Sequence, residues 1–325
     1  MEVMGKESLI IENEMKEVME FINSVFTYDL AILKEIVNQV LTRGGKRIRP
    51  TLVLLTADIF DGITRDATLA ASIIEVVHAA SLLHDDVVDG SPQRRGAESL
   101  NARFNNKVSV LLGDFLFTKA YARLSRIHDQ KVTAALADAA AHMSLGQLVE
   151  AYFQGDGEIT REEYFSVIGG KTASLFSTCC RIGALIGHAP EEQVELMARF
   201  GKNYGLAFQI TDDCLDYWGD EKLLGKPVGS DLIEKKYTLP VIHLLEEGGK
   251  EDQHLVREIF SMASPGREHI KQILSLMEKH RTREFAYGIA REFGERALAE
   301  LSGVAPCRAR VALEKMVRDI ITRDR

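Results

Sequence analysis

Residues 73–89 read IIEVVHAASLLHDDVVD, an apolar stretch that ends in three aspartates. Its apolar side chains, among them Ile73, Ile74, Val77 and Leu82, recur three and four residues apart, which is the period of a helix and not of a strand. The stretch therefore predicts a long, largely buried helix that carries carboxylates at its carboxyl end.

The remainder of the chain favours the same fold class. It has 325 residues, of which 46% are hydrophobic, 27% charged and only 7% aromatic, a balance typical of a folded, helix-rich chain. Its 7 prolines leave long proline-free stretches, and no linker, low-complexity tract or change in composition marks a boundary. We expect one all-α domain over residues 1–325.

Charge and cysteine content exclude several classes of protein. A formal net charge of −8 offers no basic field for a nucleic-acid backbone. The four cysteines (Cys179, Cys180, Cys214 and Cys307) form no CxxC pair and no zinc spacing, which favours reduced thiols. The first 21 residues lack the order of a signal peptide, and no apolar run is expected to reach spanning length. We expect a cytoplasmic protein with no transmembrane segment and no nucleic-acid partner.

The two Asp-Asp dipeptides of the chain are each followed by a third aspartate at the same offset, as DDVVD at 85–89 and DDCLD at 212–216. On a helix the first and last aspartate of each cluster lie one turn apart on one face, where like charges repel. Mg²⁺ is a natural partner, because it is held by one or two carboxylates together with water and substrate phosphate. A single cluster is better explained as a solvated acidic face, but two copies that both follow apolar stretches favour a metal site.

Cationic residues stand near both clusters. The GGKRIRP stretch at 44–50 is either an anion-binding loop or a solvated basic turn. The turn SPQRRG at 91–96 places Arg94 and Arg95 beside the first cluster, for phosphate binding or for salt bridges to its aspartates.

Two further groups complete the set. GGKT at 169–172 lacks the earlier glycine of a P-loop, which disfavours a nucleoside triphosphate but leaves Lys171 and Thr172 as phosphate contacts. The loop at 225–240 carries lysines that could close over a substrate. His78 stands two helical turns before the first cluster and is either a core histidine or a phosphate donor, whereas His84 is interpreted as structural.

No side chain presents itself as a covalent nucleophile. The inventory instead suits activation of a phosphate-type leaving group by metal and cations, and the apolar helices before both clusters suggest a substrate with a hydrocarbon part. Five ordered motifs resemble those of the trans-isoprenyl diphosphate synthases, the polyprenyl synthetase family. They are GGKRIRP at 44–50, LLHDDVVDGSPQRRG at 82–96, GGKTASLF at 169–176, FQITDDCLDYWGD at 208–220 and GKPVGSDLIEKKYTLP at 225–240.

This resemblance implies an isoprenoid-synthase helical bundle around a deep central cavity, usually a homodimer. The implied reaction is the condensation of isopentenyl diphosphate with an allylic diphosphate to an all-trans polyprenyl diphosphate. Metals assist ionisation of the allylic carbon–oxygen bond, the isopentenyl double bond attacks the cation, and the departed diphosphate takes the proton.

The resemblance also implies roles for individual residues. It implies three Mg²⁺ ions, with Asp85, Asp89 and Asp212 as direct ligands and Asp86, Asp213 and Asp216 assisting, partly through water; Asp216 is counted with the metal site. The isopentenyl diphosphate pocket matches Lys46, Arg49, His78 and Arg95, and the allylic contacts match Arg94, Lys171, Thr172, Gln209, Lys226 and Lys236. Lys171 and Lys226 join the aspartates in the expected catalytic set. The usual Glu-Gly-Lys of the family is here Glu234-Lys235-Lys236, so the sequence leaves open which lysine reaches the substrate.

Product length is argued from side-chain size. The face through Val77, Ala80 and Ser81 leads away from the first cluster, and short-chain members that resemble this one tend to place a bulky aromatic there. The small residues predict a product longer than farnesyl, from geranylgeranyl up to octaprenyl type, unless Ala80 is ordinary packing above a deeper floor. A farnesyl or geranylgeranyl short-chain synthase, a terpene cyclase and a non-catalytic partner subunit remain the alternatives. The two intact DDxxD motifs and GGKRIRP disfavour the last two.

Overall fold

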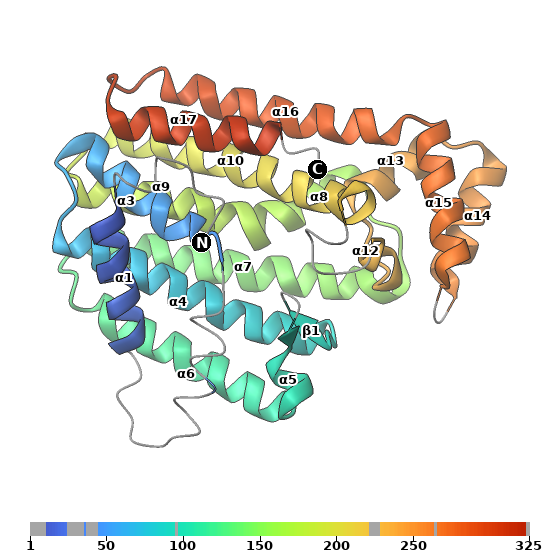
Figure 1. Cartoon of the computed structure of the whole chain (residues 1–325), viewed down its shortest axis with the longest axis horizontal. Helices are drawn as coiled ribbons and strands as arrows, with labels where there is room; N and C mark the ends of the chain where they lie inside the picture. Colours follow the sequence, from blue (N-terminus) through green and yellow to red (C-terminus); the bar gives the residue numbers. More distant parts are fainter. Residues whose placement is uncertain are drawn as a thin grey trace.

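The computed structural model describes residues 11–24, 36, 45–94, 97–220, 228–262 and 265–322. Long helices pack side by side in a bundle, and the shorter helices α13–α15 gather at one end of it (Figure 1). The expected all-α class is confirmed.

The helices are α1 (Glu12–Ser24), α3 (Ile48–Phe60), α4 (Arg65–Val88), α5 (Leu100–Arg103), α6 (Asn106–Leu124), α7 (Gln130–Asp156), α8 (Arg161–Ile168), the π-helix η3 (Gly169–Ala173), α9 (Ser174–Ile186), α10 (Glu191–Trp218), α12 (Ser230–Ile233), α13 (Leu239–Glu247), α14 (Lys250–Ser261), α15 (Arg267–Lys279), α16 (Thr282–Leu301) and α17 (Arg308–Ile321).

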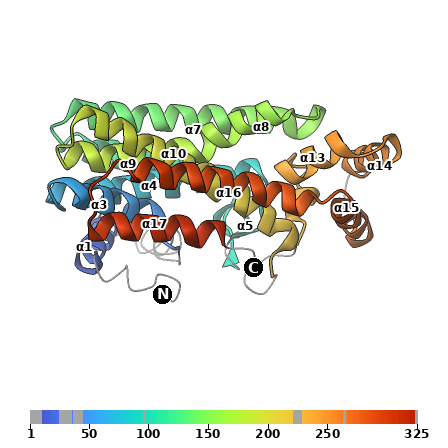
Figure 2. The ribbon, with the colours of Figure 1, turned by 90° about the horizontal axis from the view of Figure 1, so that it is seen from above.

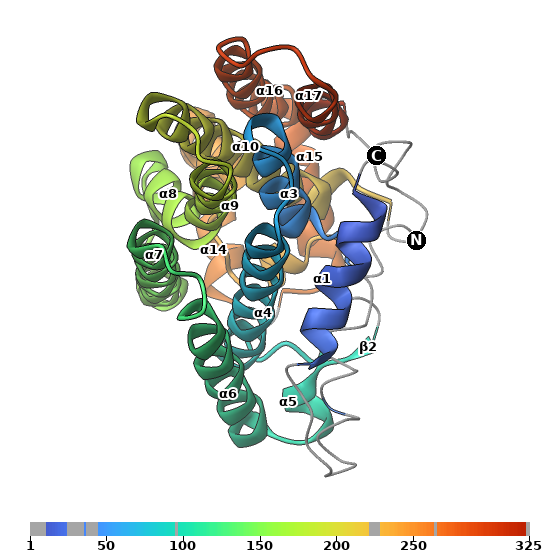
Figure 3. The same ribbon diagram turned by 90° about the vertical axis from the view of Figure 1, so that its left-hand side faces the viewer.

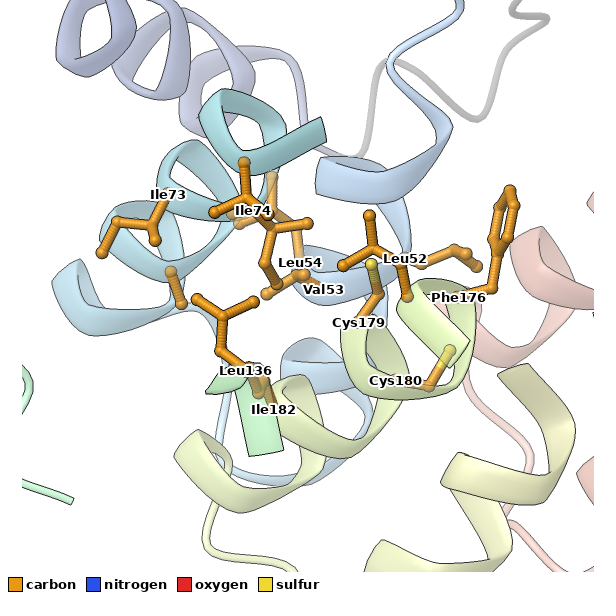
Figure 4. Close-up of a cluster of buried hydrophobic side chains, with 14 of the residues drawn as sticks. Leu52, Val53, Leu54, Ile73, Ile74, Leu136, Phe176, Cys179, Cys180 and Ile182 are labelled. Atoms are coloured by element: carbon orange, nitrogen blue, oxygen red, sulfur yellow. The ribbon is translucent and has the colours of Figure 1, made fainter. Parts of the chain in front are cut away.

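Helix α4 contains the apolar stretch that predicted a helix before the first acidic motif. Thr64 caps its start by accepting a hydrogen bond from the Ala67 backbone N–H at 3.3 Å, and the helix ends where Asp89 begins a turn. Its residues from Ala67 to Ala80 are almost all buried, because α3 and α6 pack against it. Figure 4 shows Ile74 of α4 beside Val53 and Leu54 of α3, and Leu52 of α3 beside Cys179 of α9, in one core cluster. The first acidic motif is therefore held at the end of a rigid element.

Helix α10 is the second long element of the core. Pro190 stands at its N-cap, and the helix runs to Trp218. It packs against α9 on one side and α16 on the other, and α16 turns back into α17 (Figure 2). The approach to η3 and α9 is close because Gly205 has no side chain, since a Cβ there would lie 2.8 Å from the Cα of Ala173 in η3 and 2.9 Å from the Cβ of Phe176 in α9. The second acidic motif thus ends a helix that is pressed against η3 and α9.

A short two-stranded hairpin interrupts the otherwise helical fold of the described residues. Strands β1 (Gln93–Arg94) and β2 (Ala97–Glu98) pair antiparallel directly after the first motif. The sequence predicts a turn at 91–96, and the structure places β1 within this range and β2 directly after it. The hairpin directs Arg94 back toward the end of α4.

Helix α4 also meets the length and composition of a membrane span. Its most apolar window has a mean hydropathy of 1.4, so the expectation that no apolar run reaches spanning length is wrong for this helix within the described residues. However, 78% of that window is buried inside the bundle. This burial is typical of a core helix, where apolar side chains face other helices and not lipid.

Candidate active site

The first acidic motif divides its aspartates between a buried and an open side of α4. Asp86 is 3% exposed and accepts a hydrogen bond from the Arg94 Nε at 2.6 Å. Asp85 and Asp89, one turn apart, are partly exposed. Burial raises the pKa of Asp85 to about 6, while the nearby charge of Lys171 opposes that rise and Asp89 adds to it. The motif therefore presents two carboxylates that repel each other and keeps the third as an anchor for the hairpin.

Lys236 joins the first motif to the loop that follows the second motif. Its ammonium lies 3.0 Å from the Asp89 Oδ2 and 2.8 Å from a carboxylate oxygen of Glu234. The other oxygen of Asp89, Oδ1, is buried and has no hydrogen-bond partner within the described part of the chain. A buried carboxylate oxygen without a hydrogen-bond partner destabilises the folded state, so a bound ligand at this atom is expected.

The second acidic motif is arranged differently. Asp212 is exposed, whereas Asp213 is 6% and Asp216 1% exposed. The Asp216 carboxylate accepts hydrogen bonds from the Ser230 hydroxyl and from the Asp231 backbone N–H, the latter at 2.9 Å, and so caps the start of α12. A metal at Asp216 would compete with these two bonds, whereas the Asp212 side chain is exposed.

The π-helix η3 places Lys171 and Thr172 between the two motifs. One turn of π-helix interrupts a helical run at GGKTA, a distortion that is common at functional sites. Helix α7 crosses η3 at Gly146, where a Cβ would lie 2.5 Å from the Lys171 backbone N. The crossing is possible only because Gly146 has no side chain, and it fixes the position of Lys171. These residues lie in a helix, which agrees with the rejection of a P-loop.

Two residues of α7 that the sequence analysis did not single out as site residues face this turn. Glu150 forms an ion pair with Lys171, and both side chains are about one-fifth exposed, at 21% and 23%. Its charge contributes to raising the pKa values of both Asp85 and Asp213, after the larger effect of burial. One turn earlier, both amide atoms of Gln147 are buried without a hydrogen-bond partner among the residues described. The signal available in the sequence was that Gln147 and Glu150 stand one helical turn apart, and so on one face of the helix.

A chain of three hydrogen bonds runs from η3 to α8. The Thr172 hydroxyl donates to Gln209 Oε1 at 2.8 Å, Gln209 Nε2 donates to Asp213 Oδ1 at 2.8 Å, and the Tyr164 hydroxyl donates to Asp213 Oδ2 at 2.6 Å. Burial raises the pKa of Asp213 despite these two donors. The structure thus brings together Thr172 and Gln209, as expected, and adds Tyr164.

Two of the predicted isopentenyl diphosphate residues, Lys46 and Arg49, lie at or just before the start of α3, and a third, His78, lies on α4 beside Arg49. The Arg49 Nη1 is 3.0 Å from His78 Nε2, and its guanidinium lies 4.5 Å from the ring centroid of Phe176. Lys46 is exposed in the preceding loop. Arg47 instead pairs with Glu75 of α4, so of the three basic residues in GGKRIRP it is a structural one. Arg95 and Lys226 lie outside the described residues.

The site thus combines two acidic motifs, a lysine in the π-helix and an arginine–histidine pair, and related proteins share the sequence that forms it. The polyprenyl synthetase family matches residues 30–277, more than half of the chain. The chain belongs to the polyprenyl synthetase family. An octaprenyl diphosphate synthase of Haemophilus influenzae is 34% identical over 289 residues, or 89% of this chain and 88% of that protein. A geranylgeranyl diphosphate synthase of Sulfolobus acidocaldarius is 34% identical over 298 residues, or 90% of each.

Solved structures of polyprenyl synthases share the fold. The crystal structure of a polyprenyl synthase from Caulobacter crescentus, complexed with calcium and isoprenyl diphosphate, superposes with a TM-score of 0.93 at 28% identity and covers 98% of this chain and 97% of that one. The chain therefore has the isoprenoid-synthase fold, and its family consists of trans-prenyltransferases. Relatives with different products are equally similar, so overall identity does not decide product length.

Membership of the polyprenyl synthetase family also clarifies Lys235 and Lys236. Lys235 has a φ of 57°, a left-handed conformation that glycine adopts readily and other residues rarely do. It therefore occupies the position where the family usually has glycine. Lys236, whose side chain is 17% exposed and points to Asp89, is the lysine directed into the site.

A divalent metal fits the donor set of this site. Within the described ranges no three His, Cys, Asp or Glu side chains form a cluster that could hold a metal ion by themselves. However, the oxygen donors of Asp85 and Asp89, including the unsatisfied Oδ1, suit a hard cation such as Mg²⁺, which takes its remaining ligands from water and phosphate. The carboxylates thus supply some of the metal ligands, and a bound diphosphate and water would supply the others.

The predicted chain-length residues differ in burial. Val77 and Ala80 are 0% exposed, whereas Ser81 is partly exposed and donates to the His78 carbonyl oxygen at 2.9 Å. On a helix Val77, Ser81 and Asp85 follow one another at one-turn intervals, so they lie along one face. Of the two small residues, Ser81 is therefore the one in line with the first motif.

Proposed function

We propose that the chain catalyses the Mg²⁺-dependent head-to-tail condensation of isopentenyl diphosphate with an allylic diphosphate. The observation that carries this proposal is the buried Asp89 Oδ1 without a hydrogen-bond partner among the described residues, beside the Lys236 ammonium. An unsatisfied anionic oxygen next to a cation suits the joint binding of a metal ion and a diphosphate. Family membership supplies the reaction class.

In this proposal Asp85, Asp89 and Asp212 hold three Mg²⁺ ions, with Asp216 acting through water. The metal ions would neutralise the negative charge that develops on the leaving diphosphate. Lys171 and Lys236 bind the outer oxygens of the allylic diphosphate, together with Arg94. Lys46, Arg49 and His78 bind the isopentenyl diphosphate at the start of α3.

The protein's own residues then serve three purposes. The cations at η3 and at Lys236 stabilise the diphosphate as the allylic carbon–oxygen bond breaks. The Arg49–His78 pair holds the isopentenyl double bond close to the resulting cation, to which it adds. The proton lost from the adduct passes to the departed diphosphate, which leaves a new trans double bond.

The proposed product is longer than farnesyl, from geranylgeranyl up to octaprenyl type. Support comes from the small side chains at Ala80 and Ser81 and from relatives named as octaprenyl and geranylgeranyl diphosphate synthases. An aromatic residue in line with Asp85 on this face would obstruct a growing hydrocarbon tail, whereas Ser81 is small and partly exposed.

We also propose a homodimer. Leu145, Leu148 and Tyr152 form an apolar stripe on α7 at helical spacing and are 57%, 68% and 78% exposed. Helix α7 lies at the edge of the bundle on the side away from α1 (Figure 3). Exposed apolar stripes of this kind mark interfaces between proteins.

The experiment that tests the function is a product assay. The purified protein is incubated with isopentenyl diphosphate, Mg²⁺ and each short allylic diphosphate in turn, and product length is measured by mass spectrometry. We expect elongation with at least one primer and none after chelation of the metal. No elongation with any primer would refute the proposal.

A further inference from the structure

The middle aspartate of the second motif is held away from the open side of the helix. Asp213 is 6% exposed, and each of its carboxylate oxygens accepts a hydrogen bond, one from Gln209 and one from Tyr164. The adjacent Asp212 is exposed. Because both of its oxygens are occupied by protein donors, Asp213 is poorly placed to bind a metal and well placed to orient its neighbours.

The direction of each hydrogen bond follows from the chemistry of the groups. The Gln209 amide turns its NH₂ group toward Asp213 Oδ1, which accepts its hydrogen bond, and its carbonyl oxygen the other way. That carbonyl oxygen accepts from the Thr172 hydroxyl at 2.8 Å. The hydrogen of Thr172 is thereby committed to Gln209, and its oxygen lone pairs are free to face another group.

The position of Thr172 makes this direction relevant to catalysis. Thr172 is 8% exposed, and it follows Lys171, which the proposed function assigns to the allylic diphosphate. An oxygen whose lone pairs face the reacting carbon stabilises the positive charge that develops there. A hydroxyl free to rotate would lose part of that effect, because it would have to be reoriented during the reaction.

Tyr164 is the far end of this chain. It lies on α8, is 3% exposed and donates its hydroxyl hydrogen to Asp213 Oδ2 at 2.6 Å. The capping box between Thr160 and Glu163 fixes the start of α8 immediately before it. Tyr164 is thus rigidly held and binds the Asp213 oxygen that Gln209 does not use.

We propose that Tyr164 is a positioning residue for the condensation: through Asp213 and Gln209 it fixes the direction of the Thr172 hydroxyl toward the reacting end of the allylic substrate. The inference rests on the proposed prenyltransferase function and deepens it. Tyr164 does not touch the substrate in this proposal. Its effect is on the rate of the chemical step and not on the binding of either diphosphate.

The test is a double-mutant cycle in the full chain. Tyr164→Phe removes one oxygen atom and Thr172→Val removes the hydroxyl at the other end. We expect Tyr164→Phe to lower kcat about ten-fold, with KM values for both diphosphates changed less than about two-fold. In the Thr172→Val background the same substitution changes kcat by less than about two-fold, because the group that it orients is already absent.

Tyr217→Phe is the matched control for loss of a buried tyrosine hydroxyl. Tyr217 is 2% exposed, and its hydroxyl lies 2.6 Å from Thr238 Oγ1, outside the chain that ends at Thr172. We expect both tyrosine variants to lower the midpoint of thermal unfolding by similar amounts, but only Tyr164→Phe to lower kcat.

Several outcomes would overturn the inference. They are an equal fold-loss of kcat from Tyr164→Phe in both backgrounds, a loss confined to KM, or an equal loss of kcat in Tyr217→Phe. These outcomes differ from failure of the proposed function, in which the unmodified chain itself elongates no primer.

Discussion

The Lys236 ammonium lies 3.0 Å from the Asp89 carboxylate, although 147 residues separate the two in the sequence. This pair connects the loop after the second acidic motif to the end of α4, and the charges of Asp89 and Glu234 more than offset the effect of burial, so that the pKa of Lys236 is raised. The Asp89 and Glu234 carboxylates therefore favour the charged form of Lys236, which gives Asp89 a cationic partner.

Replacing Lys236 by methionine tests this role. Lys236→Met leaves Asp89 without its cation, and we expect a loss of stability of about 2 kcal/mol, between the values for exposed and fully buried pairs. Mg²⁺ should recover part of that loss, because it can replace the ammonium, so the metal should raise the unfolding midpoint more in the variant than in the unmodified chain. We expect kcat/KM to fall about 100-fold.

Lys235→Gly is the control and should keep activity within about two-fold while relieving about 1 kcal/mol of backbone strain. Equal losses in both variants would contradict the assignment of Lys236.

The crossing of α7 and η3 at Gly146 gives a second prediction. Gly146→Ala places a Cβ 2.5 Å from the Lys171 backbone N, so the two helices must separate and Lys171 must move. We expect a loss of about 2 kcal/mol in stability and a rise in KM for the allylic diphosphate. Gly288→Ala in α16 is the matched control, because nothing lies within 4 Å of its added Cβ. That variant should be as active as the unmodified chain and slightly more stable, by about 0.5–1 kcal/mol. The KM for the allylic diphosphate and the midpoint of unfolding are measured for both variants, and equal values in the two would contradict the prediction.

Product length should respond to side-chain size on α4. Ser81→Phe adds an aromatic ring in line with Asp85 on a partly exposed face, and we expect shorter products in the mass spectrum with little loss of stability. Ala80→Phe should also shorten the product, but Ala80 is 0% exposed, so overpacking should destabilise the protein by about 1–3 kcal/mol. An unchanged product distribution in both variants would remove the steric argument and place the floor deeper in the bundle.

Acid sensitivity is expected from His243. This side chain is 7% exposed and stacks on Phe285 with 3.9 Å between ring centroids, and burial lowers its pKa below the usual value. The folded state therefore keeps His243 neutral while the unfolded chain takes up a proton below about pH 6.5, so stability falls as the pH drops through that value. His243→Gln should flatten the dependence of the unfolding midpoint on pH in this range. The exposed His254→Gln should not, and a parallel change in both variants would contradict the prediction.

The proposed dimer is tested on the apolar stripe of α7. Leu148→Glu puts a charge on a side chain that is 68% exposed in the single chain, and we expect monomers in sedimentation. Val311 on α17 is 60% exposed and apolar as well, but it lies outside the α7 stripe. Val311→Glu should therefore leave the dimer intact. Monomers in the unmodified chain, or dimers in Leu148→Glu, would refute this interface.

The sequence was informative where chemistry is encoded locally. The helical period before Asp85, the proline at the start of α10 and the acidic motifs at helix ends were all predictable, because local spacing determines which side chains share a face. The sequence was less informative about the partners of residues of the same type that stand close together in one motif. Arg47 and Arg49 stand two apart in one motif, yet Arg47 pairs with Glu75 and Arg49 with His78. Nothing in the order of the residues distinguishes them.

By itself, then, the sequence determined the all-α class, the two acidic motifs and the family that they resemble. Only the tertiary structure decided which member of each motif is open, because burial and pairing depend on elements distant in the chain. Asp86 is paired by a hairpin, Asp213 by Tyr164 of α8 and Asp216 by α12, while Asp89 keeps an unsatisfied oxygen within the residues described. The contribution of Glu150 and Tyr164 likewise depends on how α7, α8 and α10 meet at η3, a packing arrangement that no local pattern encodes.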